Sequence, residues 1–195
     1  MKLFAIGAVA LASLVASAAS AQTAGPANPG PAIPGVCVYF NQQLMAQSTV
    51  GQSVQTRMQQ LATEVQGEIT PYGTAIQSEA QALQAGASTI PAAEQQTRRQ
   101  ALQQRVNEAQ QLEQTRSEEL RYTLSEQRRQ ISVAVEPLLV AIYQEKGCGI
   151  MLDRESVFIV NPAMDVTGEV ITRLNTALPS LSFNRLPVPA QPQGQ

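Results

Sequence analysis

Two long stripes of apolar side chains, separated by a short turn, constrain the fold of this chain more than any other feature. In the first stripe, apolar or bulky residues recur every three or four positions, with Glu68 and Glu79 as acidic exceptions. This near-heptad spacing is typical of a helix that packs along a partner helix. The stripes consist of Val54, Met58, Leu61, Val65, Glu68, Tyr72, Ile76, Glu79 and Leu83, and of Leu102, Val106, Ala109, Leu112, Leu120, Leu124, Ile131, Val135, Leu138 and Ile142.

The segment between the stripes has the residue types of a turn between two helices. Gly86 suits a helix C-terminus, Ser88 or Thr89 suits an N-cap, and Pro91 suits the first turn of the next helix. The sequence therefore predicts an antiparallel helical hairpin over residues 41–146. Its arms of roughly 40 and 55 residues would extend about 60 and 80 Å.

The composition limits the chemistry available to the chain. Its 195 residues include no His and no Trp, and 15 Asp and Glu against 13 Lys and Arg give a net charge of −2. Without His, a His-based triad, a His general base and the common imidazole zinc sites are excluded. The slight acidity argues against a nucleic-acid binder, which shows a basic patch. We expect a non-enzymatic protein with no catalytic residues, no cofactor and no metal site.

Three carboxylates are close in sequence near the end of the chain. Asp153, Glu155 and Asp165 could suggest hydrolysis by paired acids, but they lack a partner base or a set of metal ligands. We interpret them as turn and helix-cap residues.

The first residues have the pattern of an export signal, which we assign to residues 1–21. Lys2 precedes an apolar run from Leu3 to Val15, and small residues at 19–21 indicate cleavage before Gln22. The alternative is a membrane anchor, but the run is shorter than the about 20 residues that span a bilayer. The mature protein is therefore expected outside the cytoplasm.

Export changes the interpretation of the two cysteines. Cys37 and Cys148 form one even pair, and a disulfide is the default in an oxidising compartment. Two buried free thiols are the alternative that remains open.

Short elements flank the hairpin and predict a small β body. Strands are expected at 35–40 and within 148–160, the latter as a β-hairpin of 148–153 and 157–160, followed by a helix at 168–177. The fold class is therefore mainly α with a small β body, and the two cysteines lie where the ends of the helical hairpin meet. Residues 22–34 are expected to form a flexible leader, and the Pro-rich residues 179–195 a loose tail.

The closing segment carries a resemblance to a known family. Asn161-Pro162-Ala163-Met164-Asp165-Val166-Thr167-Gly168-Glu169-Val170 is similar to the segment that ends members of the Skp/OmpH family of periplasmic chaperones. With the order of strand, hairpin and strands, the resemblance covers about residues 35–178. It implies a jellyfish-shaped homotrimer with a shared β body. It also implies an ATP-independent holdase for unfolded outer-membrane β-barrel proteins, with transient contact with the membrane surface as a further expectation.

The arms differ from the well-known, strongly basic members of that family. From residue 94 to 130 seven Arg face six Glu, and Arg57 stands against three Glu between 41 and 90. Arg98, Arg99 and Arg105 are the one basic group near the tip, and a solvated helix face is their simpler interpretation. Apolar and hydrogen-bonding contacts would then hold clients. The alternative function is a structural or adaptor coiled-coil protein that binds a folded partner.

Two sets of residues follow as candidates. The predicted client contacts near the tip, where Pro71 disturbs the stripe, are Tyr72, Ile76, Leu83 and Ile90. The predicted core of the body, shared in part with the trimer contact, consists of Val36, Val38, Ile150, Leu152, Phe158 and Ile159.

Overall fold

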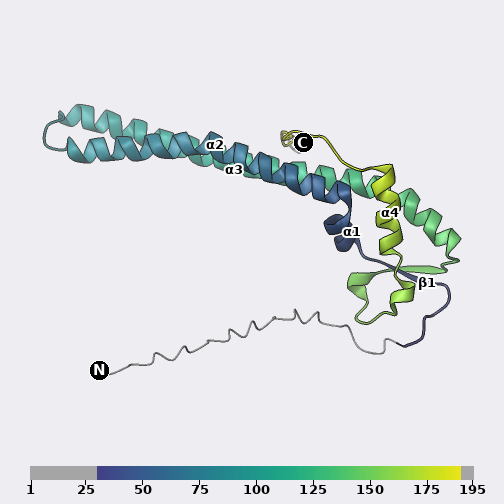
Figure 1. The fold of residues 1–195 in the computed structure, drawn as a ribbon. Coiled ribbons are helices and arrows are strands. Elements are labelled where there is room, and N and C mark those ends of the chain that lie inside the picture. The colour runs from purple at the N-terminus through teal and green to yellow at the C-terminus, as the bar shows by residue number, and fades with distance from the viewer. Residues whose placement is uncertain (1–29, 190–195) are drawn as a thin grey trace, which may run out of the picture.

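A long helical arm rises from a small base (Figure 1). The computed structural model describes residues 30–189, so the predicted signal peptide and most of the leader lie outside the described residues. The arm consists of helices α2 (Thr49–Ala85) and α3 (Ala92–Glu145), which confirms the predicted hairpin. Both helices continue through their internal prolines, Pro71 and Pro137. Along residues 30–189, no helix combines the length and apolar character needed to cross a bilayer.

The first predicted helix is in fact two helices. A short α1 (Asn41–Gln47) ends at Ser48, whose extended backbone turns the chain before α2 begins. The Ser48 hydroxyl accepts a hydrogen bond from the Gly51 N–H at 3.1 Å, which caps α2. The apolar pattern continues across this break, so it concealed the turn.

The junction between α1 and α2 requires glycine at position 51. A Cβ atom there would lie 2.0 Å from the Met45 carbonyl oxygen, whereas a Cβ at Gly67, on the same helix, would meet nothing within 4 Å. We expect Gly51→Ala to lower the free energy of unfolding by about 1–3 kcal/mol through this clash. As the matched control, Gly67→Ala should raise it by about 0.5–1 kcal/mol through helix propensity. Urea unfolding of both variants measures the difference, and equal effects would contradict the predicted role of Gly51.

The tip loop is closed by a glutamine. The Gln95 side-chain amide donates to the carbonyl groups of Ala87 and Ile90 at 2.8 and 3.0 Å. The predicted N-cap at Ser88 or Thr89 is wrong, because Pro91 occupies that position and makes no side-chain cap. The long Gln95 side chain instead reaches back over the loop and satisfies two of its carbonyl groups.

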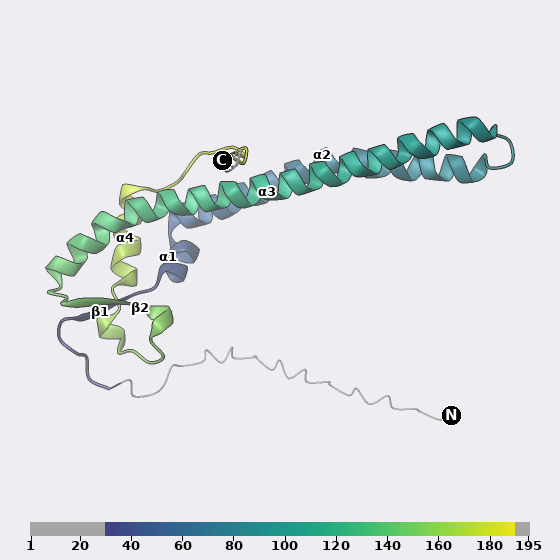
Figure 2. The same cartoon turned by 180° about the vertical axis from the view of Figure 1, so that it is seen from behind.

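The base is built on two parallel strands, which Figure 2 shows side by side. Strand β1 (Val36–Tyr39) pairs with β2 (Ile150–Asp153), so that Val36 lies opposite Ile150 and Cys37 opposite Met151. The long hairpin is therefore the crossover connection that parallel strands need. The Cys37–Cys148 disulfide joins the start of this sheet to the end of the arm. The predicted disulfide is confirmed, and free thiols are excluded.

The predicted second strand of the closing β-hairpin, residues 157–160, is wrong. After β2 the chain forms a 3₁₀ turn, η1 (Arg154–Ser156), and residues 157–160 pair with no strand among the described residues. The Arg154 guanidinium donates to the Val157 carbonyl group, which directs the backbone away from β2. The other side of β1 is filled by the later segment, since the Val166 N–H donates to the Val38 carbonyl at 2.9 Å.

Helix α4 (Thr167–Ala177) closes the base as predicted, beginning one residue earlier. It follows a second 3₁₀ turn, η2 (Pro162–Met164). The core of the base is helical more than β, because side chains from α1, α2, α3 and α4 fill it. Its fully buried members include Leu44, Val50, Ile131, Ile142, Val170 and Leu174.

The tail was predicted to be loose, and this prediction is wrong for its described part. Residues 178–189 run back along the arm, as the yellow segment in Figure 1 shows. Leu178, Leu181 and Phe183 pack against the core cluster. The leader also ends in contact with the base, since the Asn161 amide donates to the Gly30 carbonyl at 2.8 Å.

Candidate functional site

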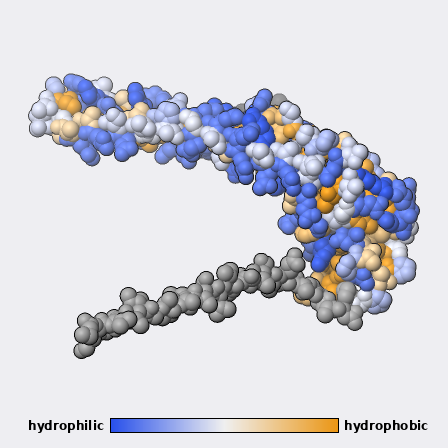
Figure 3. Space-filling model, in the orientation of Figure 1, coloured by the Kyte–Doolittle hydropathy of each residue, from blue (hydrophilic) through white to orange (hydrophobic). Residues whose placement is uncertain are grey.

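The seam between the two arm helices is closed near the base and open toward the tip. On α2 the side chains of Val54, Leu61 and Val65 are buried, but beyond Val65 only Leu83 is. On α3 every buried position lies at or after residue 123. The apolar stripe residues of the outer half, such as Leu102, Val106 and Leu112, are only half-buried. In Figure 3 the outer arm is mostly hydrophilic with isolated apolar spots.

Three of the four predicted client contacts are accessible. Tyr72 is exposed, and Ile76 and Ile90 are half-buried. Leu83 is the exception: it is 8% exposed and belongs to the seam, because the helices close again just before the tip loop. Tyr72 and Ile76 line a shallow cavity of about 250 Å³ between the helices, with Arg105 on its α3 side. This cavity can take an apolar side chain.

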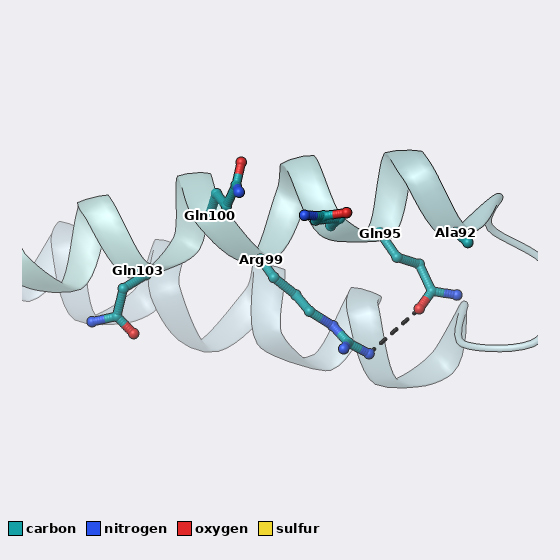
Figure 4. Close-up of a pocket in the computed structure, with 6 residues that line it drawn as sticks. Ala92, Gln95, Arg99, Gln100 and Gln103 are labelled. Atoms are coloured by element: carbon teal, nitrogen blue, oxygen red, sulfur yellow. Dashed lines mark hydrogen bonds between the residues drawn. The ribbon is translucent and has the colours of Figure 1, made fainter.

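One arginine of the basic group at the tip is paired with carboxylates. The Arg98 guanidinium lies 2.8 Å from Glu94 and 3.9 Å from Glu79 on the other helix. Arg99 instead donates to the Gln95 side-chain oxygen at 3.4 Å. Figure 4 shows Gln95 and Arg99 in an open depression of about 500 Å³ along α3. The rest of its lining consists of other glutamine side chains and Ala92. The depression offers hydrogen bonds but no converging charges.

A four-residue ion cluster explains the acidic exception at position 68. Arg116 of α3 donates to Glu68 at 2.7 Å and pairs with Glu119 at 3.0 Å, while Arg185 of the tail lies 2.8 Å from Glu68 and 2.9 Å from Glu119. Hydrogen bonds from Arg185, and then Arg116, lower the pKa of Glu68. The ion cluster therefore stabilises the fold at pH values above the ordinary pKa of a glutamate. This stabilisation is lost as the pH falls through the lowered pKa of Glu68.

The predicted body core separates into buried and exposed members. Val38 is fully buried, and Val36 and Leu152 are half-buried. Ile150, Phe158 and Ile159 are exposed, and Phe158 at 95% is the most exposed large apolar residue among those described. These three are therefore not core residues of the single chain: Phe158 and Ile159 lie outside the sheet, and Ile150 lies in β2 with its side chain exposed. The three exposed residues, one at the start of β2 and two after the following 3₁₀ turn, are the apolar edge of the base.

Turn and cap roles were predicted for all three carboxylates of the base, and the side chains of two of them have such roles. Asp153 accepts from the Glu155 N–H and Asp165 from the Thr167 N–H, each at 2.8 Å. Glu155 contributes its backbone to this turn. Burial, together with the Asp153 carboxylate, raises the pKa of Tyr39 to about 12. Within residues 30–189 no three His, Cys, Asp or Glu side chains converge in a way that could hold a metal.

Sequence reasoning missed the residues that hold the tail. Ser53 and Arg57 on α2 and Thr123 on α3 bond to the tail backbone. A signal was present, because Glu68 interrupts an apolar stripe and Arg185 is the only charged residue after position 173. The opposite charges of Glu68 and Arg185 are compatible with a contact. Because 117 positions separate the two residues in the sequence, the pattern alone did not pair them.

A small parallel sheet, joined by a disulfide to a long helical hairpin with an open outer seam, defines a hairpin-arm protein. The OmpH-like outer membrane protein family matches residues 35–174, and the chain belongs to this family. A crystal structure described as an OmpH-like outer membrane chaperone from Caulobacter crescentus CB15 is similar at 32% identity and a TM-score of 0.75. That match covers 82% of this chain and 94% of the other. No curated protein matches the chain.

Proposed function

We propose that this protein is an ATP-independent periplasmic chaperone that holds unfolded outer-membrane β-barrel proteins and prevents their aggregation. The family and the described role of the solved relative support a chaperone. The observation that carries the holding role is the open outer seam of the arm, where apolar side chains stay accessible within a polar surface. An unfolded barrel strand alternates apolar and polar residues, so dispersed apolar contacts among amides suit it better than one tight pocket.

The apolar edge of the base supports assembly into a homotrimer. Strand β2 pairs with β1 on one side, and its other edge pairs with no strand among residues 30–189. Ile150 lies in β2, and Phe158 and Ile159 follow this strand in the sequence. The side chains of all three residues are exposed. An unpaired strand edge with exposed apolar side chains favours association. Three copies sharing their bases would place three arms around one client.

The holding role is tested by dilution of a urea-denatured β-barrel protein into buffer with the mature protein. Light scattering should be suppressed at a few-fold molar excess of the chaperone, without ATP. Unchanged scattering would refute the holdase and favour an adaptor that binds a folded partner.

The tip residues should contribute measurably to holding. We expect Tyr72→Gln with Ile76→Gln to weaken client affinity about tenfold to thirtyfold, because two partly buried apolar contacts are lost. The control is Val133→Gln, which removes an exposed apolar side chain from the base half of α3. Affinity is measured by fluorescence titration of a labelled denatured client. Equal losses in both variants would mean that the tip has no special role.

A further inference from the structure

The docked tail shows what the inner part of the arm can bind. Between Leu178 and Pro189 the chain has no helix or strand, yet its backbone is held at three points. The Leu181 N–H donates to the Ser53 hydroxyl at 3.3 Å, and the Leu186 N–H donates to the Thr123 hydroxyl at 2.8 Å. These contacts use the tail backbone, so they do not require a particular tail side chain.

A third backbone contact comes from a charged side chain. Arg57 Nε donates to the Phe183 carbonyl at 3.1 Å. The three side chains that bind the tail backbone are Ser53 and Arg57 of α2 and Thr123 of α3. Thr123 is fully buried. The groove between α2 and α3 therefore presents fixed hydrogen-bonding groups to an extended main chain.

The side chains of the tail alternate in burial. Leu181, Phe183 and Arg185 face inward and are half-buried, whereas Ser182 and Asn184 are exposed. A period of two is that of a chain in extended conformation, and membrane β-strands alternate apolar and polar residues with the same period. The groove therefore accepts apolar side chains at the positions of Leu181 and Phe183 and a basic side chain at the position of Arg185.

The basic position is recognised by charge. The Arg185 side chain is 19% exposed and lies between Glu68 and Glu119, on α2 and α3 respectively. Arg116 holds the same two carboxylates from the other side. The carboxylates are therefore in place to receive a guanidinium or ammonium group.

We propose that this groove, formed around Ser53, Arg57, Glu68, Glu119 and Thr123, is a binding site for an extended segment of an unfolded client that alternates apolar and polar residues and carries a basic side chain. The tail is its resident occupant, and a client segment competes with it. This inference rests on the proposed chaperone function. The tail has no internal secondary structure to unfold, and Pro187 and Pro189 lack the N–H groups to pair with a client strand.

The test measures binding of a dye-labelled peptide of residues 178–189 to the full chain by fluorescence anisotropy. Arg185→Glu releases the tail by charge repulsion from Glu68 and Glu119 but leaves the groove intact. If the tail is docked about nine-tenths of the time, the peptide should bind this variant with an apparent Kd about tenfold lower than that of the wild type. Val188→Glu, at an exposed tail position, is the control and should behave as the wild type.

Three outcomes separate this proposal from the proposed function. Equal peptide affinity for Arg185→Glu and the wild type, or no binding to either, overturns the groove, provided that circular dichroism shows both proteins folded. A denatured barrel protein should release the bound peptide from the Arg185→Glu variant. If the client leaves the peptide bound while the chaperone still suppresses scattering, the groove is not a client site and the proposal fails, although the holdase stands. Failure in both assays removes the holdase as well.

Discussion

Replacing both cysteines by alanine is expected to lower the free energy of unfolding by about 4–5 kcal/mol. The Cys37–Cys148 bond closes a loop with a sequence separation of 111, and closing a loop of about 100 residues removes that much chain entropy from the unfolded state. Typical domains are stable by about 5–15 kcal/mol, so the base would lose much of its stability. Urea unfolding at a fixed protein concentration measures the loss, because the proposed assembly would make the midpoint depend on concentration.

Reductant provides the matched control for this prediction. The wild type in excess dithiothreitol should unfold close to, and slightly above, the urea concentration at which the alanine variant unfolds, and dithiothreitol should leave that variant unchanged. Both cysteine side chains are buried, so alanine also removes some packing. If the reduced and oxidised wild type unfold together, the bond contributes nothing to stability and the prediction is contradicted.

The arm was predictable because its information is local. Apolar residues at a spacing of three and four, together with Gly86 and Pro91, specify two helices and a turn without knowledge of any distant contact. The disulfide followed from the hairpin, since two arms that go out and return bring Cys37 and Cys148 together. The break at Ser48 escaped because a capped turn can lie within a continuous apolar pattern.

The base and the tail depend on contacts between segments far apart in the chain. Residues 157–160 have the β-branched and aromatic composition of a strand, but the 3₁₀ turn at Arg154–Ser156 and the bond from Arg154 to the Val157 carbonyl direct them away from β2, their predicted partner. The tail was assigned as loose because its prolines suggest disorder. Its period of two at Leu181, Phe183 and Arg185 spans too few residues to be recognised without the groove. The accessibility of Tyr72, Ile76 and Ile90 was predicted better, since it follows from the weakening of the stripe itself, and their contact with clients stays a prediction.

A charge at the apolar edge of the base is expected to abolish the proposed trimer. The Phe158 side chain is fully accessible in the single chain, and its burial in an interface would contribute about 2–3 kcal/mol per copy. Phe158→Asp removes this contribution and adds the cost of desolvating a carboxylate. The association constant should therefore fall by more than about a hundredfold per contact, and native mass spectrometry should report a monomer at concentrations where the wild type is a trimer.

Tyr72→Asp is the matched control, because it makes the same kind of aromatic-to-acid change at an exposed position on the outer arm. It should keep the trimer and weaken client holding, whereas Phe158→Asp should leave the arm helical and lose the trimer. Monomers that still suppress aggregation at equal arm concentration would show that one arm is sufficient for holding. A wild-type monomer, or a trimer that persists in Phe158→Asp, would mean that this edge is not the interface.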